Sequence, residues 1–97
     1  MPIDENLAVR TAELFATLSD PNRVRILAAL HEDFELNVSA LAESLGMSTS
    51  AISHQLRGLR HMRIVRARRE GRQVFYSIED DHIAQLLRQG LDHALHD

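Results

Sequence analysis

Residues 41–62 read LAESLGMSTSAISHQLRGLRHM, which is a short helical segment, a glycine and a second helical segment. Gly46 suits the left-handed backbone position that ends a helix, and Ser48 is a good N-cap for the helix that follows. The apolar residues of the second segment recur at i, i+4 and i+7: Ile52, Leu56 and Leu59. With Ala42 at the helix contact, this spacing is typical of a DNA-binding helix-turn-helix.

The next residues predict a β-hairpin rich in arginine. Residues 64–78, IVRARREGRQVFYSI, are β-branched and alternating, and Glu70-Gly71 interrupts them. A helix fits the major groove of DNA, and a hairpin wing beside it can place arginines along phosphates or in the minor groove. The sequence therefore predicts a mainly α fold with a hairpin wing, that is, a winged helix-turn-helix.

The rest of the chain completes one domain over residues 1–97. At this length a single domain is expected, and it buries little enough surface that dimerisation would help it. We expect helices over residues 4–18, 21–31, 38–46, 48–62 and 80–96, with a connector over residues 32–36. Asp20 as N-cap and Pro21 at the first helical position mark the start of the second helix.

The net charge of −3 hides a strong segregation of charge. Residues 57–72 hold seven arginines against one glutamate, whereas residues 79–97 hold five acidic residues against one arginine. A stripe of one sign on a small domain is typical of a nucleic-acid-binding face, and the alternative is a solvated basic face, which is the more common meaning of an isolated run of arginines.

Composition excludes several classes of protein. There is no cysteine, so disulfides, thiolate metal sites and a cysteine nucleophile are absent. We find no apolar run long enough for a membrane helix, no signal peptide, no phosphate-binding loop and no nucleophile motif. The expectation is a cytoplasmic binding protein that is not an enzyme and has no small-molecule substrate.

The last predicted helix carries a candidate metal site. His82, His93 and His96 share one helix face, and Asp80 lies beside His82 at the helix start. His82 and His93 are separated by about 16 Å of helical rise, far beyond metal–nitrogen distances of about 2 Å. Two antiparallel copies in a twofold dimer would bring Asp80 and His82 of one copy to His93 and His96 of the other. Asp81 is the alternative carboxylate to Asp80.

Three histidines and one carboxylate suit tetrahedral Zn(II), with Co(II) or Ni(II) also possible. Such a closed ligand set has no open position for a water nucleophile, so we expect it to regulate rather than catalyse. The alternatives are a histidine-bearing solvated helix face, and a repressor that responds to a non-metal signal and whose histidines are incidental.

Residues 48–56, STSAISHQL, and residues 65–76, VRARREGRQVFY, resemble the ArsR/SmtB family of winged-helix metal-sensing repressors. The resemblance extends over nearly the whole chain, including residues 18–26, LSDPNRVRI. It implies a homodimer, joined through its first and last helices, that binds palindromic double-stranded operator DNA and leaves it when metal binds. The DNA-binding residues that it implies are Ser48, Thr49, Ser50, Ser53, His54, Arg57, Arg68, Arg69 and Arg72. It also implies a zinc site of the terminal-helix type at Asp80, His82, His93 and His96.

Overall fold

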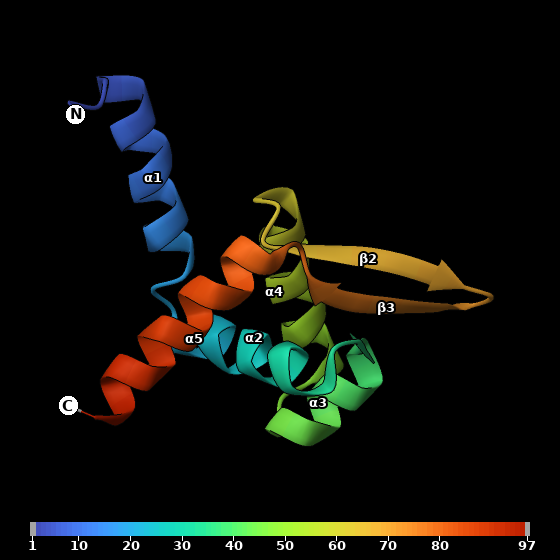
Figure 1. The fold of residues 1–97 in the computed structure, drawn as a ribbon. Coiled ribbons are helices and arrows are strands. Elements are labelled where there is room, and N and C mark those ends of the chain that lie inside the picture. The colour runs from blue at the N-terminus through green and yellow to red at the C-terminus, as the bar shows by residue number, and fades with distance from the viewer. Residues whose placement is uncertain (1, 97) are drawn as a thin grey trace.

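The computed structural model describes residues 2–96, which form five helices and a small sheet (Figure 1). The helices are α1 (Glu5–Thr17), α2 (Pro21–Asp33), α3 (Val38–Leu45), α4 (Thr49–His61) and α5 (Asp81–Leu95). The strands are β1 (Leu36–Asn37), β2 (Val65–Glu70) and β3 (Gln73–Ile78). This order confirms the predicted helices, the helix-turn-helix formed by α3 and α4, and the hairpin wing.

Local sequence sets where the helices begin. Each helix follows a capping side chain that accepts a hydrogen bond from the backbone N–H three residues later: Asp4, Asp20, Asn37, Ser48 and Asp80. These bonds satisfy N–H groups that a helix leaves without internal partners. At the other end of α3, Gly46 has φ +66°, the left-handed conformation that turns the chain toward α4.

The sheet has one more strand than the hairpin predicted. Its strands are antiparallel in the order β1–β3–β2, and Leu36 pairs with Tyr76 while Asn37 pairs with Phe75. The connector expected over residues 32–36 is therefore wrong at both ends, because α2 continues to Asp33 and Leu36 joins the sheet. Strand β1 pairs with a strand some forty positions later, so no local pattern announces it.

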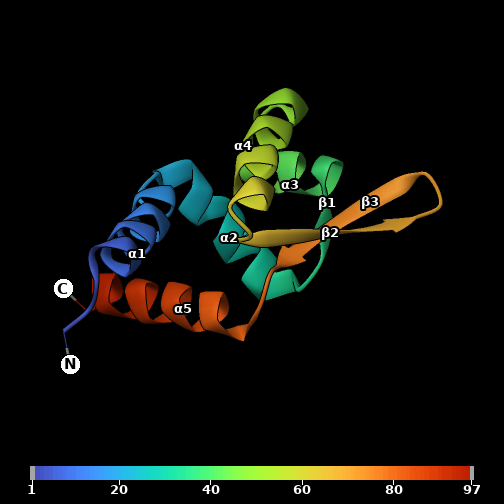
Figure 2. The same ribbon diagram turned by 90° about the horizontal axis from the view of Figure 1, so that it is seen from above.

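One apolar core joins the helices to the base of the wing. Its buried members are Ile26, Leu27 and Leu30 of α2, Leu41 and Ala42 of α3, Ile52, Leu56 and Leu59 of α4, Ile64, Val65 of β2, and Ile83 and Leu87 of α5. The distal part of β2 and β3 projects away from the helices (Figures 1 and 2). The core thus fixes the base of the wing and leaves its tip free to reach another molecule.

Helices α1 and α5 leave apolar surface uncovered. Exposed large side chains on them are Leu7, Val9, Phe15, Leu91 and Leu95. Phe15 and Leu18, with apolar residues of α2 and α5, line a groove of about 410 Å³.

No helix within residues 2–96 is both long and apolar enough to cross a membrane.

Replacing Leu56 with alanine tests the role of the α4 core face. The side chain is 1% exposed, so its truncation leaves a cavity and is expected to lower the free energy of unfolding by about 2–5 kcal/mol. Urea unfolding at one fixed protein concentration measures this loss. The control, Glu43→Ala on the exposed face of α3, should change stability by less than about 0.5 kcal/mol; an equal loss in both variants would contradict the assigned core.

Candidate nucleic-acid interface and metal-ligand pairs

Helix α4 exposes a polar face to solvent because its opposite, apolar face is buried in the core. Ile52 and Leu59 are fully buried, whereas His54 and Arg57 are exposed and Ser53 is half-buried. The helix has the dimensions needed to enter a major groove, and its side chains on this face are hydrogen-bonding types. The predicted DNA-binding residues Ser53, His54 and Arg57 therefore lie together on α4, on the side away from the core.

The start of α4 carries the remaining predicted contacts of this helix. Thr49 and Ser50 occupy its first turn and are exposed. Ser48 is exposed too, but its Oγ accepts the Ala51 N–H at 3.0 Å and caps the helix. Ser48 is therefore a structural cap first, with its hydroxyl proton still available to a further acceptor.

Arg23 of α2 ties α4 in place, a role that the sequence does not announce. Its Nε donates to Gln55 Oε1 at 2.8 Å, and its Nη1 donates to the Thr17 carbonyl oxygen at 3.2 Å. A Cβ at Gly58 would lie 3.1 Å from Arg23 Nη2, so the glycine gives the guanidinium room. Arg23 and Gln55 are 32 residues apart, which is why local patterning misses the pair.

A polar cleft of about 550 Å³ opens between α4 and β3. The residues that line it are Ser53, Leu56, Arg57, Arg60, His61 and Tyr76. Two guanidinium groups and an imidazole on one open surface favour a polyanion such as a nucleic-acid backbone. The cleft adds Arg60, His61 and Tyr76 to the residues predicted from sequence.

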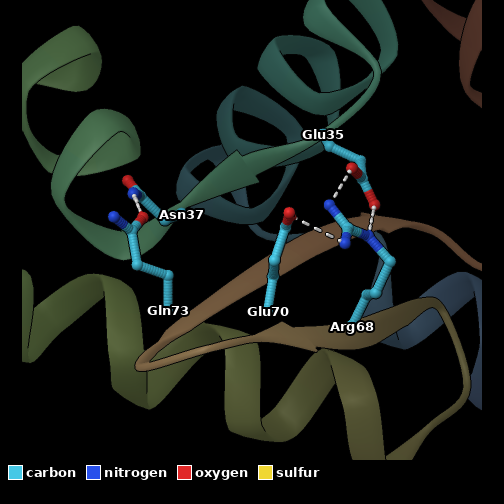
Figure 3. Close-up of polar contacts among 5 residues, drawn as sticks. All are labelled: Glu35, Asn37, Arg68, Glu70 and Gln73. Carbon is cyan, nitrogen blue, oxygen red and sulfur yellow. Dashed lines mark hydrogen bonds and ion pairs between the residues drawn. The ribbon is translucent and has the colours of Figure 1, made fainter.

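The wing arginines divide into two groups. Arg69 and Arg72 are exposed and make no ion pair among residues 2–96. Arg68 instead forms a two-pronged pair with Glu35, with both N–O distances 2.9 Å, and a third bond to Glu70 at 3.0 Å (Figure 3). Its guanidinium carbon also lies 5.1 Å from the centre of the Phe75 ring. These contacts distinguish Arg68 from the other predicted phosphate-binding arginines.

The pairing shifts the protonation of both partners toward their charged forms. The hydrogen bond from Arg68, reinforced by the charges of Arg68 and Arg66, holds the pKa of Glu35 below its ordinary value of 4.5. Hydrogen bonds to Glu35 and then Glu70 raise the pKa of Arg68 above its already high value. The pair is therefore fully ionised at neutral pH.

The four predicted metal ligands form two pairs at opposite ends of α5. Asp80 and His82 lie together at its start, with 3.6 Å between His82 Nδ1 and Asp80 Oδ1. His93 and His96 follow each other by three residues at its end, and His96 Nδ1 is 2.8 Å from the Asp92 carbonyl oxygen. The helix of 15 residues spans about 22 Å. Within residues 2–96 of a single copy, no three potential metal ligands come together.

The histidines are open to solvent rather than engaged in the core. His82 has a side chain that is 94% exposed, and that of His96 is 71% exposed. Asp80 Oδ1 accepts the Ile83 N–H at 3.0 Å, and Asp81 Oδ2 accepts from Gln85 Nε2 at 2.6 Å. The arrangement is two exposed pairs of potential metal ligands, one at each end of α5.

Comparison with protein families gives one match over the helix-turn-helix. Residues 20–67 match the family described as bacterial regulatory protein, arsR family. The matched region runs from the cap of α2 to the middle of β2 and so contains all of α3 and α4.

Comparison with individual proteins extends the similarity to nearly the whole chain. The transcriptional repressor SmtB homolog of Synechocystis is 46% identical, over 96% of this chain and 68% of its own length. The antimony-specific transcriptional repressor AntR has a solved structure with TM-score 0.87 and 34% identity, covering 100% of this chain and 90% of that one. The homodimeric winged helix-turn-helix domain Mb0332 of Mycobacterium bovis has TM-score 0.83 and 29% identity, covering 97% and 88%.

The Glu35–Arg68 pair predicts a pH-dependent contribution to stability. Because the pKa of Glu35 is lower in the folded protein than in the unfolded chain, the pair stabilises the fold above about pH 4.5 and loses this effect as pH falls through the lowered pKa. Urea midpoints of the wild type and Glu35→Gln should differ at pH 7 and converge as the pH falls below 4.5 and through the lowered pKa of Glu35. A difference that grew on acidification would contradict the pairing.

Proposed function

Because the chain belongs to the arsR family of bacterial regulatory proteins, we propose that it is a cytoplasmic repressor whose homodimer binds operator DNA and loses affinity for it when Zn(II) binds. The observation that carries the metal response is the division of α5 into two exposed donor pairs, Asp80 with His82 and His93 with His96. Neither pair is a complete site, and two antiparallel copies of α5 would complete two equivalent sites.

The exposed apolar surface of α1 and α5 supports the dimer. Leu91 and Leu95 of α5 and Phe15 of α1 are exposed in one copy, beside the apolar groove between these helices. Burying such side chains against a second copy is favourable, at about 25 cal/mol per Å² of apolar surface. The similar domain Mb0332 of M. bovis is homodimeric.

The residues of α5 fit a zinc ion by their chemistry. Three imidazoles and one carboxylate form a four-ligand nitrogen and oxygen set, which Zn(II) takes as a tetrahedron and which Co(II) or Ni(II) can also occupy. The chain has no cysteine, so it lacks the thiolates that select softer ions. Asp80 is favoured over Asp81 as the carboxylate because it lies 3.6 Å from His82, whereas Asp81 bonds to Gln85.

When bound, the ion supplies a cross-link between two copies of α5 and a closed coordination shell without redox chemistry. The contacts of the chain prepare the ligands for this role. A proton on His96 Nδ1 is donated to the Asp92 carbonyl oxygen, so Nε2 is the nitrogen left to bind metal. Asp80 uses Oδ1 as the α5 cap and presents its other oxygen.

The DNA contacts are proposed in two sets. The exposed polar residues of α4 and its cap face base edges and nearby phosphates: Ser48, Thr49, Ser50, Ser53 and His54. Arg57, Arg69 and Arg72, of which the last two make no ion pair within residues 2–96, neutralise phosphates. In a twofold dimer the two copies of α4 would meet half-sites about one DNA turn apart.

A DNA-binding titration with and without zinc tests the proposal. The probe is a duplex of about 30 bp, enough for two half-sites, selected from a random library by the metal-free protein. We expect ZnCl2 to weaken binding about 5–150-fold at fixed salt, the range of a typical coupling free energy. Fluorescence anisotropy measures it, and an unchanged affinity would exclude metal-controlled release.

His93→Ala should keep the metal-free DNA affinity and lose the zinc response, because it removes one of four ligands from each site. The matched control is His31→Ala, an exposed histidine in the last turn of α2 that is not among the proposed ligands, and it should retain both the DNA affinity and the zinc response. Calorimetry should give one zinc ion per chain for the control and a loss of binding for His93→Ala. If both variants still responded to zinc, the assigned ligands would be wrong.

Base reading and phosphate binding predict different effects of mutation. His54→Ala should change which bases are preferred, because it removes a hydrogen-bonding group from the groove-facing helix. Arg72→Gln should weaken binding to all duplexes and lower the slope of log K against log salt concentration by about 0.9. Selection from a random library and salt titrations measure the two effects; a uniform loss for His54→Ala would rule out base reading by that residue.

A further inference from the structure

Arg68 is the most heavily engaged side chain of the wing. It lies in the middle of β2, directly opposite Phe75 of β3 in the strand register, and its guanidinium stacks against that ring at 5.1 Å. Both prongs of the guanidinium then reach carboxylates, Glu35 through Nε and Nη2 and Glu70 through Nη1. Three bonds in a fixed planar fork specify the orientation of the partners as well as their distance.

Glu35 is itself held by an unusual stretch of backbone. Phe34 has φ +70° and ψ −58°, and the Glu35 N–H donates to the Asp33 carbonyl oxygen at 2.8 Å. These values describe a γ-turn of the rare positive-φ type, which a bulky residue adopts only when its surroundings require it. The turn ends α2 and delivers Glu35 to the edge of the sheet, one residue before Leu36 pairs with Tyr76.

A second bond ties the same segment to the far part of the wing. Asn37 Nδ2 donates to Gln73 Oε1 at 2.7 Å (Figure 3). Asn37 Oδ1 accepts the Ala40 N–H and caps α3. Residues 34–37 therefore connect the end of α2 and the start of α3 to β2 and β3. The helix-turn-helix and the wing meet at this short segment.

We propose that Arg68 is a positioning residue that sets the angle of the wing against the helix-turn-helix through Glu35, and that it does not bind a DNA phosphate. This inference rests on the proposed DNA-binding function. Two carboxylates already more than neutralise Arg68, so a phosphate approaching it would meet net negative charge. Successive residues of a strand face opposite sides of a sheet, so Arg69 points away from this cluster, and it has no ion pair among residues 2–96.

Isolated surface ion pairs contribute little, and bidentate geometry within a network is the exception. Here the pair joins segments 33 residues apart and adds an aromatic contact, so its loss frees one segment relative to the other. Without the pair, the wing would spend less time in the position that contacts the DNA phosphate backbone, and DNA affinity would fall. Glu35 should then support DNA binding although it carries the same charge as DNA.

Salt titrations of DNA binding distinguish positioning from phosphate contact. The variants are Arg68→Gln, Glu35→Gln and the double variant, with Arg69→Gln as the matched control on the opposite face. With the selected duplex, Arg69→Gln should lower the slope of log K against log salt by about 0.9. Arg68→Gln and Glu35→Gln should each weaken binding about threefold or more at every salt concentration with the slope unchanged, and the double variant should lose no more than either.

If Arg68 contacted a phosphate, both variants would behave differently from this expectation. Arg68→Gln would then flatten the salt slope as Arg69→Gln does, and Glu35→Gln would tighten binding by removing the competing carboxylate. Either result overturns the inference.

Amide hydrogen exchange without DNA separates this inference from the proposed function. Glu35→Gln and Arg68→Gln should speed exchange of the wing amides in residues 65–78 about fivefold or more, and Arg69→Gln should not. If the wild type bound no duplex, the proposed function would fail while faster exchange would still support the positioning role. Unchanged exchange in Glu35→Gln and Arg68→Gln would overturn the positioning role whatever the DNA result.

Discussion

The burial of one face of α4 is the constraint on which the rest of the molecule depends. Ile52, Leu56 and Leu59 are at most 1% exposed, and their packing on α2 and α3 leaves the helix no freedom to rotate. A rotation of α4 would bring polar side chains into an apolar interior, at a cost of several kcal/mol for each group without a partner. The polar face of α4 is therefore exposed to solvent because its apolar face must stay buried in the core.

Basic and acidic residues are also separated between different parts of the molecule. The net charge of −3 says little about partners, because the arginines concentrate on α4 and the wing while acidic residues concentrate at α5. Pairing then refines this pattern, since Glu35 and Glu70 neutralise Arg68, whereas Arg57, Arg69 and Arg72 are exposed and make no ion pair within residues 2–96. The positive surface is thus smaller and better defined than a count of arginines indicates.

Features encoded by neighbouring residues could be predicted, and features encoded by distant ones could not. Asp20, Ser48 and Gly46 bond to residues no more than four positions away, so the helix boundaries they set could be predicted from sequence. Strand β1 and the Glu35–Arg68 pair depend on partners more than thirty positions away, which no local period reveals. The γ-turn at Phe34 was hidden for the same reason, because a bulky residue at positive φ contradicts its own local preference.

The metal ligands illustrate a limit of a different kind. Their types and spacing on α5 could be predicted from sequence, but the proposed site would belong to two chains, so a single copy shows only two separate pairs of candidate ligands. One copy does show how α5 is connected to α4 through the core and through α2. Ile83 and Leu87 lie in the same core as Leu27 and Leu56, and Arg23 joins α2 to Gln55 of α4. Because close-packed interiors transmit displacement rather than absorb it, in the proposed dimer a shift of α5 imposed by a second copy would move α2 and, through it, α4.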